Sequence, residues 1–296
     1  MDSEYLTTKE VAELLRIKER KVYDMAAEEL IPCTRATGKL LFSRHAVQRW
    51  LLNHSSGAAS GRQLSQPLFA GSHDPLLEWA VRECQCGIPT LFDGSADGLE
   101  RVADGQATAG AMHIYSPQTE TWNSHAVDVR VNDEPLVLVK WVTRQRGLTV
   151  TPGLKIKSIK DIAASKAPPA MVLRQPGAGS QLLLEHLLNE ESLTLSDLNV
   201  ALTARSEADM VQAIAAGRAE CGLGLESLAG LHGLDFVPLL EERFDLLIDR
   251  RFWFEPPMQK FINFCNSSAF TAKVAESAGY RADSLFEVVS VYPLLD

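Results

Sequence analysis

Apolar residues near the beginning of the chain recur at the spacing of an α-helix. Val11, Leu14 and Leu15 form one apolar stripe, which predicts a helix that packs along one side. Thr7 is a favourable N-cap residue, and Glu10 three positions later completes a capping box. The first helix is therefore expected to begin directly after Thr7.

A second helix, a hairpin and a third helix are expected to follow. The second helix spans about residues 19–28, with Val22 and Met25 facing the first helix. Strand-like residues around a Thr-Gly pair predict a short hairpin over residues 34–42. Ser43 is expected to cap the third helix. The inward side chains of this third helix should be those of Ala46, Val47, Trp50 and Leu51.

Beyond residue 67 the pattern changes to short apolar runs that alternate with helical segments. Strands are expected at 68–71, 89–92, 107–114, 137–142, 147–150, 170–173, 219–224, 236–240 and 244–248. Helices are expected at 72–81, 95–104, 181–190 and 206–216, with a short one near 160 and two more at the C-terminal end. This alternation predicts a parallel sheet with helices on its faces. Two similar α/β halves, with the chain crossing out and back, predict a bilobed protein with a ligand cleft.

A segment rich in Ser, Gly and Ala separates the two patterns and has almost no apolar anchors, which is typical of a linker. The chain therefore divides into a small α-helical domain and a bilobed α/β domain. The expected boundaries are 1–52 for the first domain, 53–66 for the linker and 67–296 for the second domain. Within the second domain, lobe 1 is expected to span about 67–150 and 243–296, and lobe 2 about 151–242.

Composition and charge narrow the class of protein. The chain is 46% hydrophobic and 23% charged, as in an ordinary globular protein. No apolar run reaches the roughly 18 residues that span a bilayer, and no signal-peptide pattern opens the chain. A cytoplasmic protein without a membrane partner is therefore expected.

The net charge of −9 is unevenly distributed. Residues 1–52 contain nine Lys and Arg against eight Asp and Glu, whereas residues 53–296 contain 20 against 30. An acidic second domain repels nucleic acid, so any contact with DNA must come from a local basic surface on the first domain.

Enzyme chemistry and metal binding find little support in the sequence. The five cysteines are odd in number, and the pair Cys84 and Cys86 lacks zinc-knuckle spacing, so free thiols are expected. The loop around Gly177 and Gly179 has neither the spacing of a P-loop nor that of a nucleophile elbow. Neither an enzyme nor a cofactor is expected.

The first domain resembles the excisionase-type, MerR-like winged helix-turn-helix family. The similar elements are "YLTTKEVAELL", "KVY", the "IP" exit, a Gly-Lys wing and "FSRHAVQRWL", which together cover residues 5–52. The resemblance implies that the second helix enters the major groove of double-stranded DNA and that the wing contacts the backbone or the minor groove. It assigns DNA contacts to Lys18, Arg20, Lys21, Tyr23, Arg35, Thr37, Lys39 and Arg44.

Two features qualify this DNA-binding interpretation. Glu19, Asp24, Glu28 and Glu29 on the same helix weaken its electrostatic attraction to DNA and leave the sequence preference open. A module this small supplies few phosphate contacts, so a homodimer or higher oligomer is expected. A helical module for protein contacts is the alternative.

The second domain resembles the type 2 periplasmic-binding-protein fold, in particular the cytoplasmic substrate-binding domains fused to molybdopterin-biosynthesis proteins and to short helix-turn-helix domains. Six segments match in order: "FAGSHDPLLE", "DGSADGLERVADGQATAGAMHIY", "VTRQRGLTVTPG", "LRQPGAGSQLLLEHLL", "AIAAGRAECGLGLES" and "LDFVPLLEERFDLLI". The resemblance implies that a small ligand binds between the two lobes.

Three serines indicate the chemistry of that ligand. Ser72, Ser95 and Ser180 each follow a strand or a Gly-rich turn at the expected start of a helix, where free N–H groups suit an anion. Arg174 would add charge, and Gly177 and Gly179 would let the backbone approach closely. His113 follows a strand at the same edge and is a further candidate, with a hydrogen-bonded core histidine as the alternative. Simple N-capping remains the alternative for each serine, and a role for His73 or Glu226 in the cleft stays open.

This set of residues resembles the sites of tungstate- and molybdate-binding members of the fold. The sequence therefore predicts a one-component transcriptional regulator that senses a small oxyanion, with molybdate or tungstate favoured. A small carboxylate such as formate would fit the same donors. A cytosolic oxyanion carrier, whose first domain mediates protein contacts, is the second alternative.

Overall fold

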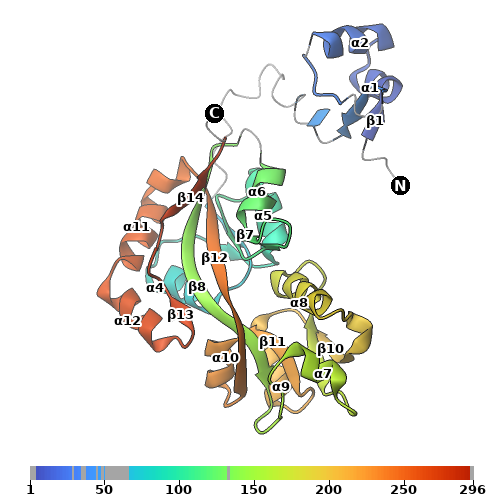
Figure 1. The fold of residues 1–296 in the computed structure, drawn as a ribbon. Coiled ribbons are helices and arrows are strands. Elements are labelled where there is room, and N and C mark those ends of the chain that lie inside the picture. Colours follow the sequence, from blue (N-terminus) through green and yellow to red (C-terminus); the bar gives the residue numbers. More distant parts are fainter. Residues whose placement is uncertain are drawn as a thin grey trace. The chain divides into compact units, whose positions relative to one another are not determined.

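The computed structural model describes residues 5–28, 30–34, 38–44, 46–47, 50, 67–131 and 134–293. The chain divides into two compact units, Met1–Gln63 and Leu64–Asp296 (Figure 1). We call the first unit the head and the second unit the body, and describe each by itself.

The head begins with a short strand and two helices in the predicted order. β1 (Tyr5–Thr7) is followed by α1 (Thr8–Leu15) and α2 (Glu19–Ala27), and β1 pairs antiparallel with β2 (Leu41–Ser43). The predicted capping box is present, because Thr7 Oγ1 accepts from the Glu10 amide at 3.3 Å while Glu10 Oε2 accepts from the Thr7 amide at 2.7 Å. The β1–β2 pair was not predicted.

The core of the head differs from the sequence prediction at one position. Val11, Val22, Phe42 and Val47 are completely buried, but Leu14 is 42% exposed. The predicted apolar stripe was therefore wrong at Leu14.

The hairpin and the third helix of the head are visible in part. The backbones of Thr34 and Leu41 exchange hydrogen bonds of 2.8 and 3.0 Å, as a hairpin over residues 34–42 requires. Residues 44, 46, 47 and 50 have helical conformation, and the Ala46 amide donates to Ser43 Oγ at 3.4 Å, which agrees with the predicted cap. Leu51 lies outside the described residues.

The body is a mixed α/β unit built around one large sheet. The strands of this sheet run in the order β10-β9-β11-β8-β12-β5-β3-β4, and β13 and β14 pair with β8. Its strands are β3 (Phe69–Gly71), β4 (Thr90–Leu91), β5 (Ala109–Met112), β8 (Leu136–Val150), β9 (Ala170–Arg174), β10 (Asn199–Ala204), β11 (Cys221–Leu225), β12 (Asp235–Asp249), β13 (Tyr280–Arg281) and β14 (Val288–Val291). A separate hairpin contains β6 (Tyr115–Ser116) and β7 (Thr121–Trp122).

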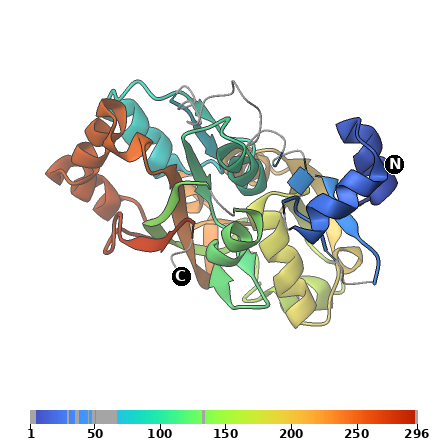
Figure 2. The ribbon, with the colours of Figure 1, turned by 90° about the horizontal axis from the view of Figure 1, so that it is seen from above.

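Helices cover this sheet in both halves of the body. They are α4 (Pro75–Glu83), α5 (Ser95–Ala103), α6 (Ser124–Arg130), α7 (Ile159–Ala164), α8 (Gly179–Glu190), α9 (Glu207–Ala215), α10 (Glu226–Leu231), α11 (Pro256–Cys265) and α12 (Ser268–Glu276). α11 and α12 pack beside α4 at one end of the body, where the red and cyan helices lie together (Figures 1 and 2).

Two long strands replace four of the predicted short ones. The expected strands 137–142 and 147–150 are one continuous strand, β8, and the expected strands 236–240 and 244–248 are one continuous strand, β12. These two strands pair antiparallel over their whole length, from Asp235 opposite Val150 to Asp249 opposite Leu136. The sheet is therefore mixed and not parallel. The prediction failed because charged residues interrupt both apolar runs, and in the structure these charges are buried in ion pairs.

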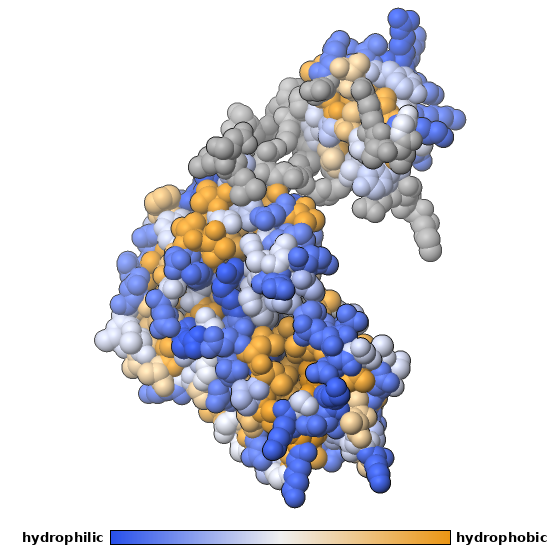
Figure 3. All heavy atoms as spheres, viewed as in Figure 1, coloured by the Kyte–Doolittle hydropathy of each residue, from blue (hydrophilic) through white to orange (hydrophobic). Residues whose placement is uncertain are grey.

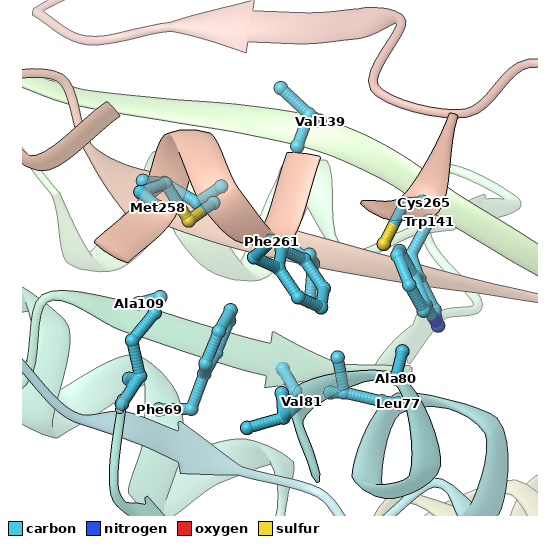
Figure 4. Packing of buried hydrophobic residues seen from close by; sticks show 14 of the residues in the cluster. Phe69, Leu77, Ala80, Val81, Ala109, Val139, Trp141, Met258, Phe261 and Cys265 are labelled. Atoms are coloured by element: carbon cyan, nitrogen blue, oxygen red, sulfur yellow. The ribbon is translucent and has the colours of Figure 1, made fainter. Parts of the chain in front are cut away.

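β8 and β12 run through both halves of the body, so that each half has a parallel core attached to the same antiparallel pair (Figure 1). In lobe 1, the ring of Phe261 on α11 stacks on Trp141 at 5.4 Å and meets the edge of Phe69 at 5.3 Å (Figure 4). In lobe 2, a separate cluster includes Leu148, Met171 and Leu184. The two lobes therefore have independent cores.

Hydrophilic side chains cover much of the viewed face of each unit, with apolar patches between them (Figure 3). None of the helices in the described part of the chain combines the length and apolar character that crossing a membrane requires.

Candidate functional site

A cavity of about 30 Å³ lies between the two lobes of the body. Its wall is formed by the residues that follow β3, β5 and β9 and by those that lead into α5, α8 and α9. One water molecule needs about 10–15 Å³ by the same measure, so the cavity suits a ligand of only a few non-hydrogen atoms. Five of the seven residues that the sequence predicts for the ligand lie in this wall: Ser72, His113, Arg174, Gly179 and Ser180.

Three helices of the described body begin at this cavity: α9, whose start is capped by Ser206, and α5 and α8, one from each lobe. The N-cap of α5 is Gly94 and that of α8 is Ala178, and neither helix start receives a side-chain capping hydrogen bond. The first N–H groups of a helix have no partner inside the helix, and the helix dipole makes this end positive. Gln175 Nε2 donates to the backbone oxygen of Asp93 across the lobes at 3.5 Å. The cavity therefore combines two electropositive helix ends.

The alternative interpretation, that Ser72, Ser95 and Ser180 are simple N-caps, was wrong. Asp74 caps α4 by accepting from the Leu77 amide at 2.7 Å, whereas Ser72 lies two residues before this cap. Ser95 is the first residue of α5, and Ser180 is the second residue of α8. Because these serines do not cap their helices, their hydroxyl groups are available for other contacts.

Among these serines, the hydroxyl of Ser180 is the strongest candidate for a ligand contact. Ser180 is only 2% exposed, and its Oγ has no hydrogen-bond partner among the described residues. His73 also lines the cavity, with Nδ1 buried and without such a partner, while its Nε2 lies 2.8 Å from Glu78. A buried polar group without a partner costs free energy, and so these atoms mark a place where a ligand would be stabilised.

Ser72 and Ser95 both contact His113. Ser72 Oγ lies 2.9 Å from His113 Nε2, and Ser95 Oγ accepts from the His113 amide at 3.1 Å. Ser95 does not line the cavity, so its observed contact positions His113. The other ring nitrogen, Nδ1, lies 2.9 Å from Glu242 Oε2. Burial lowers the pKa of His113, which keeps the imidazole neutral near pH 7.

Arg174 is engaged within the protein. Its Nη1 lies 3.1 Å from Glu207, and its Nη2 and Nε donate to backbone oxygens at 2.8 and 3.3 Å.

Arg205 also lines the cavity, is exposed, and forms no ion pair with the described residues. Gly177 is exposed outside the cavity wall, and Glu226 at the start of α10 does not line it either.

A chain of buried ion pairs extends from this wall through the centre of the body. Arg146 lies 2.7 Å from Glu207 and 3.0 Å from Glu242, and Arg144 pairs with Glu242 and, at 2.8 Å, with Asp74. Burial alone would raise the pKa of Glu242, but the two arginines hold it well below its usual range. Together with Arg174, the network contains three arginines and three carboxylates.

The sequence reasoning missed this network. The segment "VTRQRG" carried a signal, because two arginines inside an otherwise apolar run must be either exposed or paired. Arg144 and Arg146 are 1% and 0% exposed, which places them in the second class.

Ser72, His113 and Glu242 follow one another in the order of a Ser–His–acid triad. Two features set the arrangement apart from an activated nucleophile. Glu242 already accepts hydrogen bonds from both arginines, and burial lowers the basicity of His113. The small cavity also leaves little room for an acyl substrate, so the geometry favours ligand binding.

The head presents its own candidate surface on α2. Lys18, Arg20, Lys21 and Tyr23 are all exposed, and Tyr23 is 52% exposed. Glu19, Asp24 and Glu28 are exposed on the same segment, so the surface is mixed in charge. Lys39 is exposed and Arg44 is half-buried, whereas Arg35 and Thr37 lie outside the described residues.

Comparison with known proteins places both units in families. The model of the PBP superfamily domain matches residues 78–266, and a helix-turn-helix domain model matches residues 5–55. The chain belongs to the PBP superfamily, with a helix-turn-helix domain at its N-terminal end. The family of the head suggests DNA binding, and the family of the body suggests binding of a small ligand.

Individual proteins are similar to the whole chain or to its body. The chain is 22% identical to "Uncharacterized protein YvgK" of Bacillus subtilis (strain 168), over 96% of this chain and 97% of that protein. The body is similar to a putative phosphate ABC transporter substrate-binding protein with bound phosphate from Clostridium perfringens, at a TM-score of 0.53 and 14% identity, over 73% of this chain and 98% of that one. A phosphate transport receptor from Vibrio cholerae gives a TM-score of 0.47 at 14% identity, over 73% and 98%.

Proposed function

We propose that the protein is a one-component transcriptional regulator whose body binds a small oxyanion between its lobes and whose head binds DNA. The observation that carries the ligand proposal is the buried hydroxyl of Ser180, which has no partner among the described residues and lies at the start of α8. Hydroxyl and backbone N–H donors around a small cavity are the groups that stabilise an oxyanion.

Phosphate is the first ligand to consider within this class. The sequence favours molybdate or tungstate, but no comparison supports that choice. Asp93 is an exposed residue that lines the cavity, and its carboxylate, turned toward the ligand, would repel fully deprotonated oxyanions such as molybdate. Hydrogen phosphate retains an O–H that can donate to a carboxylate, and the similar protein from Clostridium perfringens binds phosphate. We therefore place phosphate before molybdate, tungstate and formate.

Calorimetric titration of the full-length protein with phosphate, sulfate, molybdate, tungstate and formate tests the ligand proposal. Ser180→Ala should weaken binding by about 10- to 100-fold, because a hydrogen bond to a charged group contributes about 1.5–3 kcal/mol. Ser165→Ala is the matched control, since the Ser165 hydroxyl donates to the Ala167 carbonyl at 2.9 Å and does not line the cavity. Unchanged affinity in Ser180→Ala would show that the anion binds elsewhere.

Asp93→Asn identifies the kind of oxyanion. If the ligand is hydrogen phosphate, this change should weaken binding, because the neutral amide oxygen is a weaker acceptor for the ligand O–H than the carboxylate. If the ligand is molybdate or tungstate, the same change should strengthen binding, since it removes a negative charge from the cavity wall.

A gel-shift assay on the DNA upstream of the gene, with and without phosphate, tests the regulator. A regulator requires that the anion change DNA affinity, because a ligand shifts a conformational equilibrium only through different affinities for its states. If the protein binds the anion but does not shift the DNA, the alternative of an oxyanion carrier is favoured. The exposed acidic residues of α2 support that alternative.

A further inference from the structure

The buried charges beside the cavity already balance one another. Arg144, Arg146 and Arg174 face three carboxylates in a continuous chain of ion pairs that reaches the cavity wall at Arg174. An anion that enters the cavity therefore finds no free positive charge in this network, and Arg205, which lines the cavity and forms no ion pair with the described residues, is exposed to solvent. Buried charges need such compensation, because their transfer from water is costly.

The neutral form of His113 determines whether the Ser72 hydroxyl donates or accepts a hydrogen bond. Glu242 is ionised and only accepts, so His113 Nδ1 must carry a hydrogen. In a neutral imidazole the other nitrogen, Nε2, is then an acceptor, and the Ser72 hydroxyl 2.9 Å away must donate to it. The Ser72 amide is also occupied, because it donates to the Ala111 carbonyl at 2.8 Å.

Ser72 consequently offers only lone pairs to the cavity while His113 is neutral. Lone pairs repel the unprotonated oxygens of an oxyanion, and the single O–H of hydrogen phosphate is directed to Asp93 in the proposed site, so the Ser72 hydroxyl must turn toward the ligand before it can stabilise one of those oxygens. Turning it would leave two lone pairs facing each other, one on Ser72 Oγ and one on His113 Nε2, unless Nε2 acquires a proton.

On the basis of the proposed anion site, we infer that the oxyanion binds together with one proton, which is taken up at Nε2 of His113. The protonated ring then donates to both Glu242 and Ser72, and the Ser72 hydroxyl donates to the ligand. The added positive charge compensates the ligand charge within one side chain of the cavity. His113 thus determines the charge that the closed site accepts.

The groups around His113 make its proton depend on the ligand. Glu242 on β12 favours the protonated ring, whereas Arg144 and Arg146 on β8 oppose it. The ring of Phe244 stacks on His113 with centroids 5.7 Å apart, and the start of α8 closes the remaining side, where Gly179 is adjacent to the imidazole. Glu207 on α9 is the further carboxylate whose field reaches the ring. Because the carboxylate on β12 and the arginines on β8 act in opposite directions, a bound anion beside the ring determines whether His113 is protonated.

Calorimetry of the full-length protein with inorganic phosphate at pH 8, in two buffers of different ionisation heat, measures the protons taken up. We expect about one proton per bound phosphate, and an affinity that falls about tenfold from pH 7.5 to 8.5. His113→Gln should abolish the proton uptake, because an amide does not titrate. His232→Gln is the matched control, since His232 is exposed at the end of α10 and should leave the uptake unchanged.

Nuclear magnetic resonance of ¹⁵N-labelled histidine gives a second measurement that does not depend on a variant. Phosphate at pH 8 should shift the His113 ring nitrogens from the neutral to the protonated pattern. Phosphate binding without proton uptake, or uptake that persists in His113→Gln, would overturn this inference and leave the anion site intact. Failure of all five anions to bind would overturn the anion site and the inference with it.

Discussion

Glu207 and Arg174 form an ion pair of 3.1 Å at the wall of the cavity, at the point where α9 begins beside the end of β9. Glu207 is shared, because Arg146 also donates to it at 2.7 Å. The carboxylate is 3% exposed and links the cavity to the buried network. The arginine that the sequence offers for an anion is thereby held by the protein's own carboxylate.

Replacement of Glu207 by Gln should lower stability and raise anion affinity together. Removing one partner of a buried ion pair costs about 3–5 kcal/mol, because the remaining charge is uncompensated. The released Arg174 would at the same time be free to attract the anion. Urea unfolding with and without phosphate measures both effects. Glu191→Gln, at an exposed pair with Lys160, should change neither, and a variant as stable as the wild type would contradict the prediction.

Acid should remove the contribution of Glu207. Burial alone would raise the pKa of Glu207, but Arg146 and Arg174 lower it to about 2, below its ordinary value of 4.5. The folded state binds this proton less readily than the unfolded state, so the stabilisation is complete above about pH 5 and disappears as the pH falls toward 2. Urea unfolding of wild type and Glu207→Gln from pH 6 to pH 3 should show converging stabilities. A constant difference would contradict this assignment.

Asp245 should produce the opposite dependence on pH. Burial raises its pKa to about 6, against the influence of Arg243 and Asn123. The folded state therefore binds this proton more readily than the unfolded state, and stability should fall as the pH rises from about 4 to about 6. Asp245→Asn should remove this decrease and raise stability at pH 7 on the order of 2 kcal/mol. Parallel pH profiles of the two proteins would show that Asp245 does not titrate in this window.

A methyl group at Gly179 should push the two lobes apart at the cavity. A Cβ at this position would lie 2.7 Å from His113 Cε1 and 2.8 Å from its carbonyl oxygen, and neither atom can move freely. Gly179→Ala is therefore expected to weaken phosphate binding by more than about tenfold, although Ala normally stabilises a helix by about 0.5–1 kcal/mol. Gly230→Ala is the matched control in α10, where a Cβ meets nothing within 4 Å. Tight phosphate binding by Gly179→Ala would mean that binding does not need the close approach of Gly179 to His113.

Lys21 should contribute to DNA affinity in a salt-dependent way. It is exposed on α2, so Lys21→Ala should lower affinity and reduce the slope of log K against log salt by about one for each DNA phosphate that the lysine neutralises. Lys9→Ala removes an exposed lysine from α1 and serves as the control of equal charge. Equal slopes for both variants would assign DNA binding to a different surface.

Much of the fold could be predicted because local signals and packing agree. The capping box at Thr7 and the buried Val11 and Val22 define the head, and apolar runs locate most strands of the body. β8 and β12 were each divided in two because Arg144 and Glu242 look like exposed breaks in the sequence. Their burial depends on partners far away along the chain, which periodicity does not reveal.

The site was predicted in position more than in detail. Five of the expected ligand residues line one cavity because the ends of neighbouring strands meet at the same edge of the sheet. Their roles depend on which side chain caps each helix, and Asp74 occupies the capping position that the sequence favours for Ser72. Arg205 was missed because the local sequence does not show which of the two arginines is paired with a carboxylate and which is unpaired among the described residues at the cavity.

The pairing of β8 with β12 shifts register between Phe244 and Asp245, and these two strands run through both lobes. An irregularity of this kind is the easiest place for a strand pair to bend. Phe244 stacks on His113, so this register shift lies beside a residue that lines the cavity. A rotation of one lobe against the other about this register shift would therefore move the His113 side of the cavity wall.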